Sequence, residues 1–274
     1  MSATKDQQPR LGGMALANGV LVHGPRYWAC AVRDDKGKLQ LASGEKPLQA
    51  AEAGRLVRGP LRIGEIFALL PTVRRALPAA KLPFERPGVL SAMAGSVVAA
   101  RVLRATRLNP LVQESLVALA ALAPAVVALR GSGLAEYHGA EHISIGSYEH
   151  GERREREHER CGSHMLGPML VTTAAGSALA ARAPAHLRPL ARVGAAVGSV
   201  AAAVEVFSWM VANGTHPVAR ALAKPGHELQ HRFVTAEPTP EQLEVAEAAL
   251  TECLRLESAA DGPEDGAAQE APPT

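Results

Sequence analysis

The sequence predicts a mainly α-helical protein, with a small helical membrane domain joined to a glycine-rich N-terminal lobe. Long and nearly uncharged apolar segments follow one another between residues 88 and 212. Aromatic residues make up only 3% of the chain, and helices that pack in lipid use small residues instead. Before residue 60 the apolar runs are short and separated by glycine, which is typical of strands. A codon preference for alanine, glycine and arginine would explain part of this composition.

The N-terminal lobe is expected to contain a β-hairpin. The apolar runs 19–22 and 27–33 have the character of strands. Residues 34–37 contain two aspartates and a glycine, which predicts a turn. After the lobe, residues 61–77 interleave apolar and basic side chains at helical spacing, which predicts an amphipathic, interfacial helix with a break or kink at Pro71.

The membrane domain is expected to form two helical hairpins with up to four spans. The apolar segments that supply them are 88–100, 111–129, 165–181 and 190–212. In a soluble protein the same segments would be buried core helices. Lysine and arginine are concentrated outside the hairpin links, so we expect a multi-pass protein of the cell membrane with its 131–164 loop on the cytoplasmic side. Arginines in the two links argue against this orientation.

Composition divides the chain into consecutive parts. They are a disordered start (1–10), the Gly-rich lobe (11–60), an amphipathic helical segment (61–87), the membrane domain with its 131–164 site loop (88–212), a C-terminal segment with a capped helix (213–256) and a disordered acidic tail (257–274). The cap is predicted by Thr239, Pro240 and Gln242, which form a capping box with proline at the first helical position.

Charge and cysteine content limit the class of partner. The net charge is +2, with basic residues concentrated at the start and acidic residues at the end. A nucleic acid is therefore not expected as a partner, whereas a lipid bilayer is. The three cysteines are widely spaced and odd in number, which argues against a disulfide framework and for a reducing compartment. Residues 1–10 are polar, so we expect no cleavable signal peptide.

The best candidate metal site is the pair His138 and His142. Residues four apart lie one above the other on a helix, so both imidazoles can face one ion. Glu141 stands on the same side of the helix. The order His-x-x-Glu-His is that of the inverzincins, in which the glutamate is the general base beside a zinc-bound water. The pattern is short, so its specificity alone is weak.

Residues further along the chain can complete the metal shell. Zinc takes three or four nitrogen, sulfur or oxygen ligands, and Glu149, His158 and Cys161 follow within the same stretch. His158 also belongs to the alternating charges of 151–160, for which a solvated surface is the simpler interpretation. Glu205 stands in an otherwise uncharged apolar segment, and an intramembrane carboxylate is a functional candidate because its burial is costly.

Several motifs match a known pattern. The most specific is Tyr137-His-Gly-Ala-Glu-His142 with Tyr148-Glu149, followed by His158-x-Arg160-Cys161-Gly162, by Glu205 after an apolar segment, and by Leu229-Gln230. In these blocks the chain resembles the YqhQ-like family, a group of uncharacterised membrane proteins labelled predicted metal-dependent enzymes. The resemblance extends from residue 11 to residue 256. It implies a membrane location, a metal site, and functional roles for Tyr137, Arg160, Gln230 and Glu205.

The chain also departs from that family's pattern. The family commonly has glutamine at Met14, glutamate at Asn18, methionine and arginine at Val22 and His23, and lysine at Ile143. Apart from Ile143, these positions lie in an N-terminal block that resembles the family in Gly12-Gly13-x-Ala15, Gly19-Val20 and Gly24-Pro25.

Two classes of function follow from these observations. The first is a membrane-associated hydrolase that depends on a divalent metal, with zinc as the expected ion and Glu141 activating a metal-bound water; its substrate would be a membrane protein or a lipid-linked molecule. The alternative is a non-catalytic membrane scaffold or assembly factor with a structural metal. A shell closed by four protein ligands would favour the scaffold, and an open position beside Glu141 the hydrolase. Ion transport through Glu205 is a third and weaker hypothesis.

Overall fold

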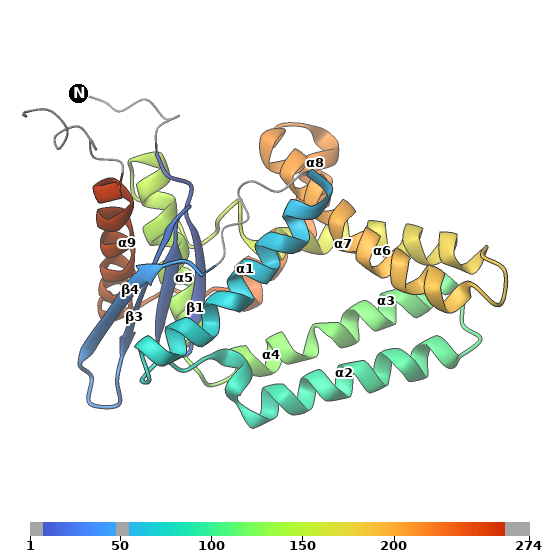
Figure 1. Cartoon of the computed structure of the whole chain (residues 1–274), viewed down its shortest axis with the longest axis horizontal. Coiled ribbons are helices and arrows are strands. Elements are labelled where there is room, and N and C mark those ends of the chain that lie inside the picture. The colour runs from blue at the N-terminus through green and yellow to red at the C-terminus, as the bar shows by residue number, and fades with distance from the viewer. Residues whose placement is uncertain (1–7, 48–54, 261–274) are drawn as a thin grey trace, which may run out of the picture.

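A computed structural model describes residues 8–47 and 55–260 of the chain (Figure 1). Residues 1–7 of the predicted disordered start and residues 261–274 of the predicted acidic tail lie outside the described residues. Within the described part the protein is mainly helical, with one small antiparallel sheet near the N-terminus. The predicted fold class is confirmed at this level.

The sheet has four strands in sequential order: β1 (Gly12–Leu16), β2 (Gly19–His23), β3 (Tyr27–Arg33) and β4 (Leu39–Glu45). The predicted hairpin is β3 and β4. Its turn is stabilised by Asp34, whose Oδ1 accepts hydrogen bonds from the backbone N–H groups of Lys36 and Lys38, each at 2.9 Å. Gly37 adopts a φ of +76°, which favours glycine. β1 and β2 extend this hairpin to a meander.

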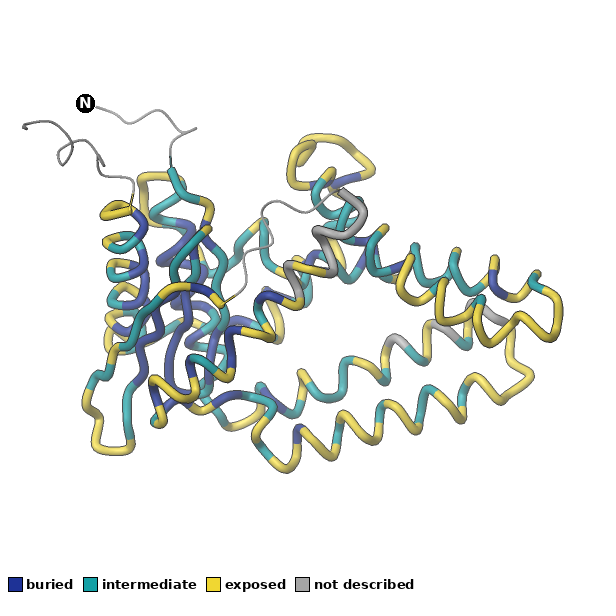
Figure 2. Tube along the Cα trace, viewed as in Figure 1, coloured by how far each residue is buried: buried dark blue, intermediate teal, exposed yellow. Residues whose placement is uncertain are grey.

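The two faces of the sheet bury different sets of side chains, because successive residues of a strand point to opposite sides. Val20, Val22, Ala29 and Ala31 face α5 (Leu134–His150) and α9 (Pro240–Ala260). Leu21, Cys30 and Val32, among others, face α1 (Arg55–Ala76). Figure 2 shows that the buried residues gather in this three-layer body. The packing of this body therefore fixes the position of α5.

α1 is the predicted amphipathic helix, but it continues through Pro71 without a break. Leu69, Leu70 and Val73 pack against the sheet. In the middle of the helix, Glu65 forms a buried ion pair with Lys46, and Lys46 Nζ also donates to Gly24 O at 2.9 Å. One apolar side of α1 is thus used inside the protein, while Leu61 and Phe67 of the same helix are exposed. Its predicted position at the membrane interface stays a prediction.

A second group of helices extends away from the sheet (Figure 1). It comprises α2 (Pro87–Ala105), α3 (Pro110–Ala121), α4 (Ala123–Leu129), α6 (Leu166–Ala181) and α7 (Arg188–Ala212). α6 and α7 pack against each other through small residues. Thr172 Oγ1 donates to Ser199 O at 3.0 Å, and Ser199 Oγ donates to Thr172 O at 2.9 Å. Close approach through small and hydroxyl side chains is typical of helices in membranes.

Two described helices, α2 and α7, are long and apolar enough to cross a membrane. A third span results if Ser115–Leu129 and Leu134–His150 are taken together, although they meet at a bend of 92°. α2 exposes Val97, Val98 and Val102, and α7 exposes Leu190 and Val193. Such contiguous apolar surface suits lipid better than water. The structure therefore supports membrane association, while the prediction of up to four spans remains a prediction.

The C-terminal part returns to the sheet. It contains α8 (Pro217–Leu229), the π-helical turn η3 (Gln230–Val234) and α9. The predicted capping box is present: Thr239 N donates to Gln242 Oε1 at 2.8 Å, and Gln242 N donates to Thr239 Oγ1 at 3.3 Å. α9 runs to Ala260, past the expected end at residue 256. Glu257 is buried and accepts hydrogen bonds from the N–H groups of Arg26 and Tyr27, both at 2.8 Å.

Candidate metal centre

α5 supplies the first residues of the site. The helix begins after Gly133 and ends at Gly151, both with positive φ. His138, Glu141 and His142 share one side of it, and Glu141 and His142 are buried.

Gly139 lets the 234–238 segment approach α5. A Cβ at this position would lie 2.1 Å from Ala236 O, so the backbone contact requires glycine. Ala236 N donates to Ala135 O at 2.9 Å in the same contact. Gly139 weakens the helix locally, yet it allows the segment that carries Val234 to reach the site.

The orientation of both imidazoles is set by backbone carbonyls. His138 Nδ1 lies 2.8 Å from Val234 O, and His142 Nδ1 lies 2.6 Å from Arg156 O. A carbonyl oxygen only accepts hydrogen bonds, so each Nδ1 carries the proton and each Nε2 has a free lone pair. Histidines that bind metals show this arrangement, because the second hydrogen bond fixes the tautomer and the ring orientation.

Cys161 reaches the same point from the loop after α5. Its Sγ lies 3.6 Å from His138 Nε2. The ligand atoms of His138, His142 and Cys161 all lie within 4.8 Å of one another. Bonds to zinc of about 2.0–2.3 Å place tetrahedral ligand atoms roughly 3.3–3.7 Å apart. The ligand atoms of the three side chains would need to move about 1 Å closer together to bind one ion. Their nitrogen and sulfur atoms suit zinc.

Burial sets the protonation of the α5 side chains. It lowers the pKa of His142 to about 2, and the neighbouring His138 acts in the same direction, so His142 is the neutral imidazole that a metal requires. Burial also raises the pKa of Glu141 to about 7, against the opposing effect of His138. Glu141 Oε2 lies 3.9 Å from His138 Nε2. A carboxyl group with a pKa near neutrality is suited to proton transfer.

Glu149 and His158, both predicted as ligands, form a separate pair beside this cluster. His158 Nε2 lies 3.1 Å from Glu149 Oε2, and Glu149 also forms an ion pair with Arg160. The His158 and His142 rings are close, with centroids 5.5 Å apart. The structure therefore brings three of the predicted ligands to one point and places Glu149 and His158 next to them.

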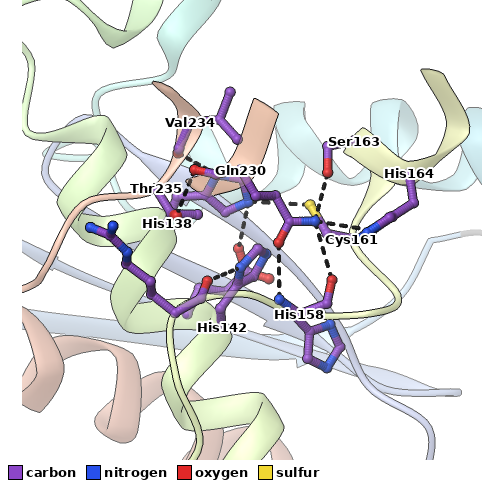
Figure 3. Close-up of polar contacts among 11 residues, drawn as sticks. His138, His142, His158, Cys161, Ser163, His164, Gln230, Val234 and Thr235 are labelled. Carbon is purple, nitrogen blue, oxygen red and sulfur yellow. Dashed lines mark hydrogen bonds and ion pairs between the residues drawn. The ribbon is translucent and has the colours of Figure 1, made fainter. Parts of the chain in front are cut away.

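Gln230 holds the loop that carries Cys161 (Figure 3). This side chain is fully buried, and its Oε1 accepts a hydrogen bond from His158 N at 2.9 Å. Its Nε2 lies within hydrogen-bond distance of His158 O at 3.2 Å, Ser163 Oγ at 2.7 Å and His164 Nδ1 at 3.0 Å. Gln230 also opens η3, whose Val234 accepts from His138. It therefore connects two parts of the site.

The other predicted residues lie elsewhere. Tyr137 is buried in the core between α5, α9 and the sheet, where burial raises the pKa of its hydroxyl. Glu205 is half-buried on α7 and does not line the cavity at the site. Sequence reasoning did not find the carbonyls of Val234 and Arg156, because every residue has a carbonyl. It also did not find the role of Gly13, where an added Cβ would lie 2.3 Å from Glu141 Oε1.

The three candidate ligands and Glu141 line a cavity of about 660 Å³. β1 lines it along Gly12–Ala15, and α4 lines it with Ala125, Ala128 and Leu129. Leu134, Ile145, Leu229 and Val234 contribute further apolar surface. A mostly apolar cavity with a few polar groups at one end is the usual form of a ligand site.

Comparison with known proteins finds similarity over the part of the chain that contains these residues. Residues 132–256 match a family described as "Protein of unknown function (DUF1385)". The chain is also 32% identical over 131 residues to the uncharacterized protein YqhQ of Bacillus subtilis strain 168, which covers 45% of this chain. The match spans only 41% of that relative's length. No solved structure matches the chain significantly.

These findings show that the chain is similar to a YqhQ-like, uncharacterised family over somewhat less than half of its length. The matched residues 132–256 include the three clustered candidate ligands His138, His142 and Cys161, as well as Glu141 and Gln230. Neither description names a metal or a reaction. The resemblance over residues 11–131 is not reached by the family match and stays a prediction.

Proposed function

We propose that the protein is a membrane-associated, metal-dependent hydrolase, with a divalent ion held by His138, His142 and Cys161. The observation that carries this proposal is the pair of Nδ1 hydrogen bonds to backbone carbonyls. They orient the two Nε2 lone pairs, and the Cys161 sulfur and the buried carboxyl group of Glu141 lie beside them. Zinc is the ion that best suits two imidazoles and a thiolate.

The arrangement favours catalysis over a purely structural role. Catalytic zinc sites use three protein ligands and leave one position open, whereas structural sites use four. A bound ion would supply Lewis acidity and lower the pKa of a coordinated water. Glu141, a buried carboxyl group one residue before His142 on the same side of α5, would be placed to accept that proton and later to return it. The adjoining cavity supplies space for a substrate.

One observation favours the alternative of a structural metal in a scaffold or assembly factor. The His158 ring lies 5.5 Å from the His142 ring. A modest movement of the 151–161 loop, away from Glu149, would bring a fourth ligand to the ion and close the shell. Mutation of Glu141 separates the two functions, because a structural site does not need this carboxyl group.

For the membrane arrangement, we propose a multi-pass protein with the metal centre on the cytoplasmic side. The exposed apolar surfaces of α2 and α7 support spans. The concentration of basic residues outside the links of the hairpins supports the orientation.

The metal content of the purified, membrane-reconstituted protein tests the proposal. Wild type should contain about one zinc per chain, as three protein ligands predict, and His138→Ala/His142→Ala should lose it. His227→Ala/His231→Ala is the matched control, because this exposed pair has the same spacing outside the cluster. Equal metal content in all three proteins would contradict the metal centre. Glu141→Gln should keep the metal and, in a hydrolase, lose the cellular function; a scaffold would keep both.

A further inference from the structure

The free edge of β1 is a feature of the cavity that the metal centre does not use. We propose that an extended peptide binds there, by pairing with β1 as an additional strand next to Glu141. This inference rests on the proposed function and deepens it, because it names the class of substrate.

The direction of the free backbone groups follows from the sheet. β1 is an edge strand. In an antiparallel pair, alternate residues of each strand turn their N–H and C=O groups toward the partner. Ala17 N, directly after β1, turns away from β2 and donates to Lys81 O at 3.1 Å. Ala15 and Gly13 therefore turn the same way, and among the described residues their backbone groups have no hydrogen-bond partner.

Along the outer edge of β1, the hydrogen bond of Ala17 to Lys81 is thus not continued at Ala15 and Gly13, which line the cavity. The cavity is lined by Gly12–Ala15 and by apolar side chains of α4 and α5. Backbone groups left unpaired against apolar surroundings cost free energy. A peptide strand would satisfy them, whereas a hydrocarbon chain would not. Strand addition to an exposed edge is a common way in which proteins bind peptides.

The edge of β1 lies next to Glu141 and therefore next to the proposed metal centre. Its carboxyl group lies against Gly13, where an added Cβ would come within 2.3 Å of Oε1. A peptide paired opposite Gly13 would pass beside Glu141 and the three ligands. Its side chains would alternate, so every second one would face the apolar wall formed by Leu129 and Ile145. We therefore expect apolar side chains at alternate positions.

The other edge of the sheet provides an internal comparison. β4 is also an edge strand, but none of its residues lines the cavity. Asp34 N bonds Lys38 O, so alternation along the pair turns the N–H of Leu41 outward. Leu41 is 46% exposed and thus suitable for a matched substitution.

The test uses the full chain in lipid nanodiscs and a dansyl-labelled hexapeptide amide of alternating leucine and serine, followed by fluorescence anisotropy. Ala15→Pro removes the outward N–H without removing a bond to β2. We expect it to weaken binding roughly tenfold, which corresponds to the net loss of about one hydrogen bond. Leu41→Pro should bind as wild type does. A peptide whose alternate amides are N-methylated lacks the N–H donors for this pairing and should also bind wild type more weakly. This comparison uses only the wild-type protein, so it does not depend on how the variant folds.

Each result has a definite meaning. Equal affinity of wild type for both peptides, or binding of dansyl-dodecylamine in place of the peptide, would overturn the inference; the second result would identify a lipid-like ligand instead. Peptide binding that persists in His138→Ala/His142→Ala, with no metal in wild type, would support edge pairing and refute the metal centre. Metal in wild type without peptide binding would refute edge pairing alone.

Discussion

His138 and His142 each donate an Nδ1 hydrogen bond to a backbone carbonyl, and Cys161 lies 3.6 Å from one of the two remaining Nε2 atoms. These contacts distinguish the pair from two histidines that merely share a helix face. The exposed pair His227 and His231 has the same spacing and no such carbonyl contacts among the described residues. The ability of a histidine pair to bind a metal therefore depends on the carbonyl oxygens that accept a hydrogen bond from each Nδ1.

Cys161 can be tested by the spectrum of the cobalt-loaded protein. A thiolate bound to cobalt gives a ligand-to-metal charge-transfer absorption, which imidazole ligands do not give. We expect this band in wild type and its loss in Cys161→Ser, because the hydroxyl is a poor ligand for this ion. Cys253→Ala should keep the band, since Cys253 is buried between α9 and the sheet. Its retention in Cys161→Ser would show that the sulfur is not a ligand.

Gln230 should affect metal affinity by holding the Cys161 loop in position, without binding the metal itself. Gln230→Leu removes the hydrogen bonds to His158, Ser163 and His164 that hold the Cys161 loop. Loss of such supporting contacts lowers metal affinity by roughly 10–100-fold. We expect this decrease in a zinc competition titration. Gln113→Leu on α3, which also removes side-chain hydrogen bonds to carbonyls, should leave the affinity unchanged. A shift in both variants would indicate general destabilisation.

Among the elements, those that depend on local signals were predictable. The start of α9 follows from its capping box, and the shared face of His138 and His142 follows from helical periodicity. β1 and β4 have weak strand sequences, GGMAL and LQLASGE, and are strands because they pair with β2 and β3. Cys161 was predicted as a ligand from its residue type and its place in the same stretch. The hydrogen bonds that hold its loop come from Gln230, which lies far along the chain, so no local pattern indicates how the loop returns to α5.

Gly139 lowers the stability of α5 locally but allows the close contact with the backbone of Ala236. We expect Gly139→Ala to destabilise the protein by about 1–3 kcal/mol, the range for forcing extra atoms into a packed interface. The reason is the 2.1 Å approach of the new Cβ to Ala236 O. Gly64→Ala in α1, where nothing lies within 4 Å, should be neutral or stabilising by up to about 1 kcal/mol. Thermal unfolding of both variants measures the difference, and equal midpoints would contradict the close contact.

At the scale of the whole molecule, the protein has two parts with different surfaces. The sheet, α1, α5 and α9 form a body with a conventional buried core, whereas α2 and α7 leave large apolar side chains exposed (Figure 2). The cavity lies where these parts meet, since both β1 and α4 line it. A substrate could thus be held by the rigid body while part of it remains near the bilayer.

The arrangement across the membrane can be tested with phosphatase fusions, which are active only outside the cytoplasm. With two helical hairpins, a fusion in the α6–α7 link at residue 185 should be active, because the link would lie on the far side. A fusion after Ala260 should be inactive, since α9 packs on the body that holds the proposed metal centre. A fluorescent-protein fusion at each site, fluorescent only in the cytoplasm, is the reciprocal control. Activity after Ala260 would reverse the proposed orientation. Inactivity at both sites would mean that α6 and α7 do not cross the bilayer, and α7 would then have to bury its apolar residues against lipid or a partner from one side.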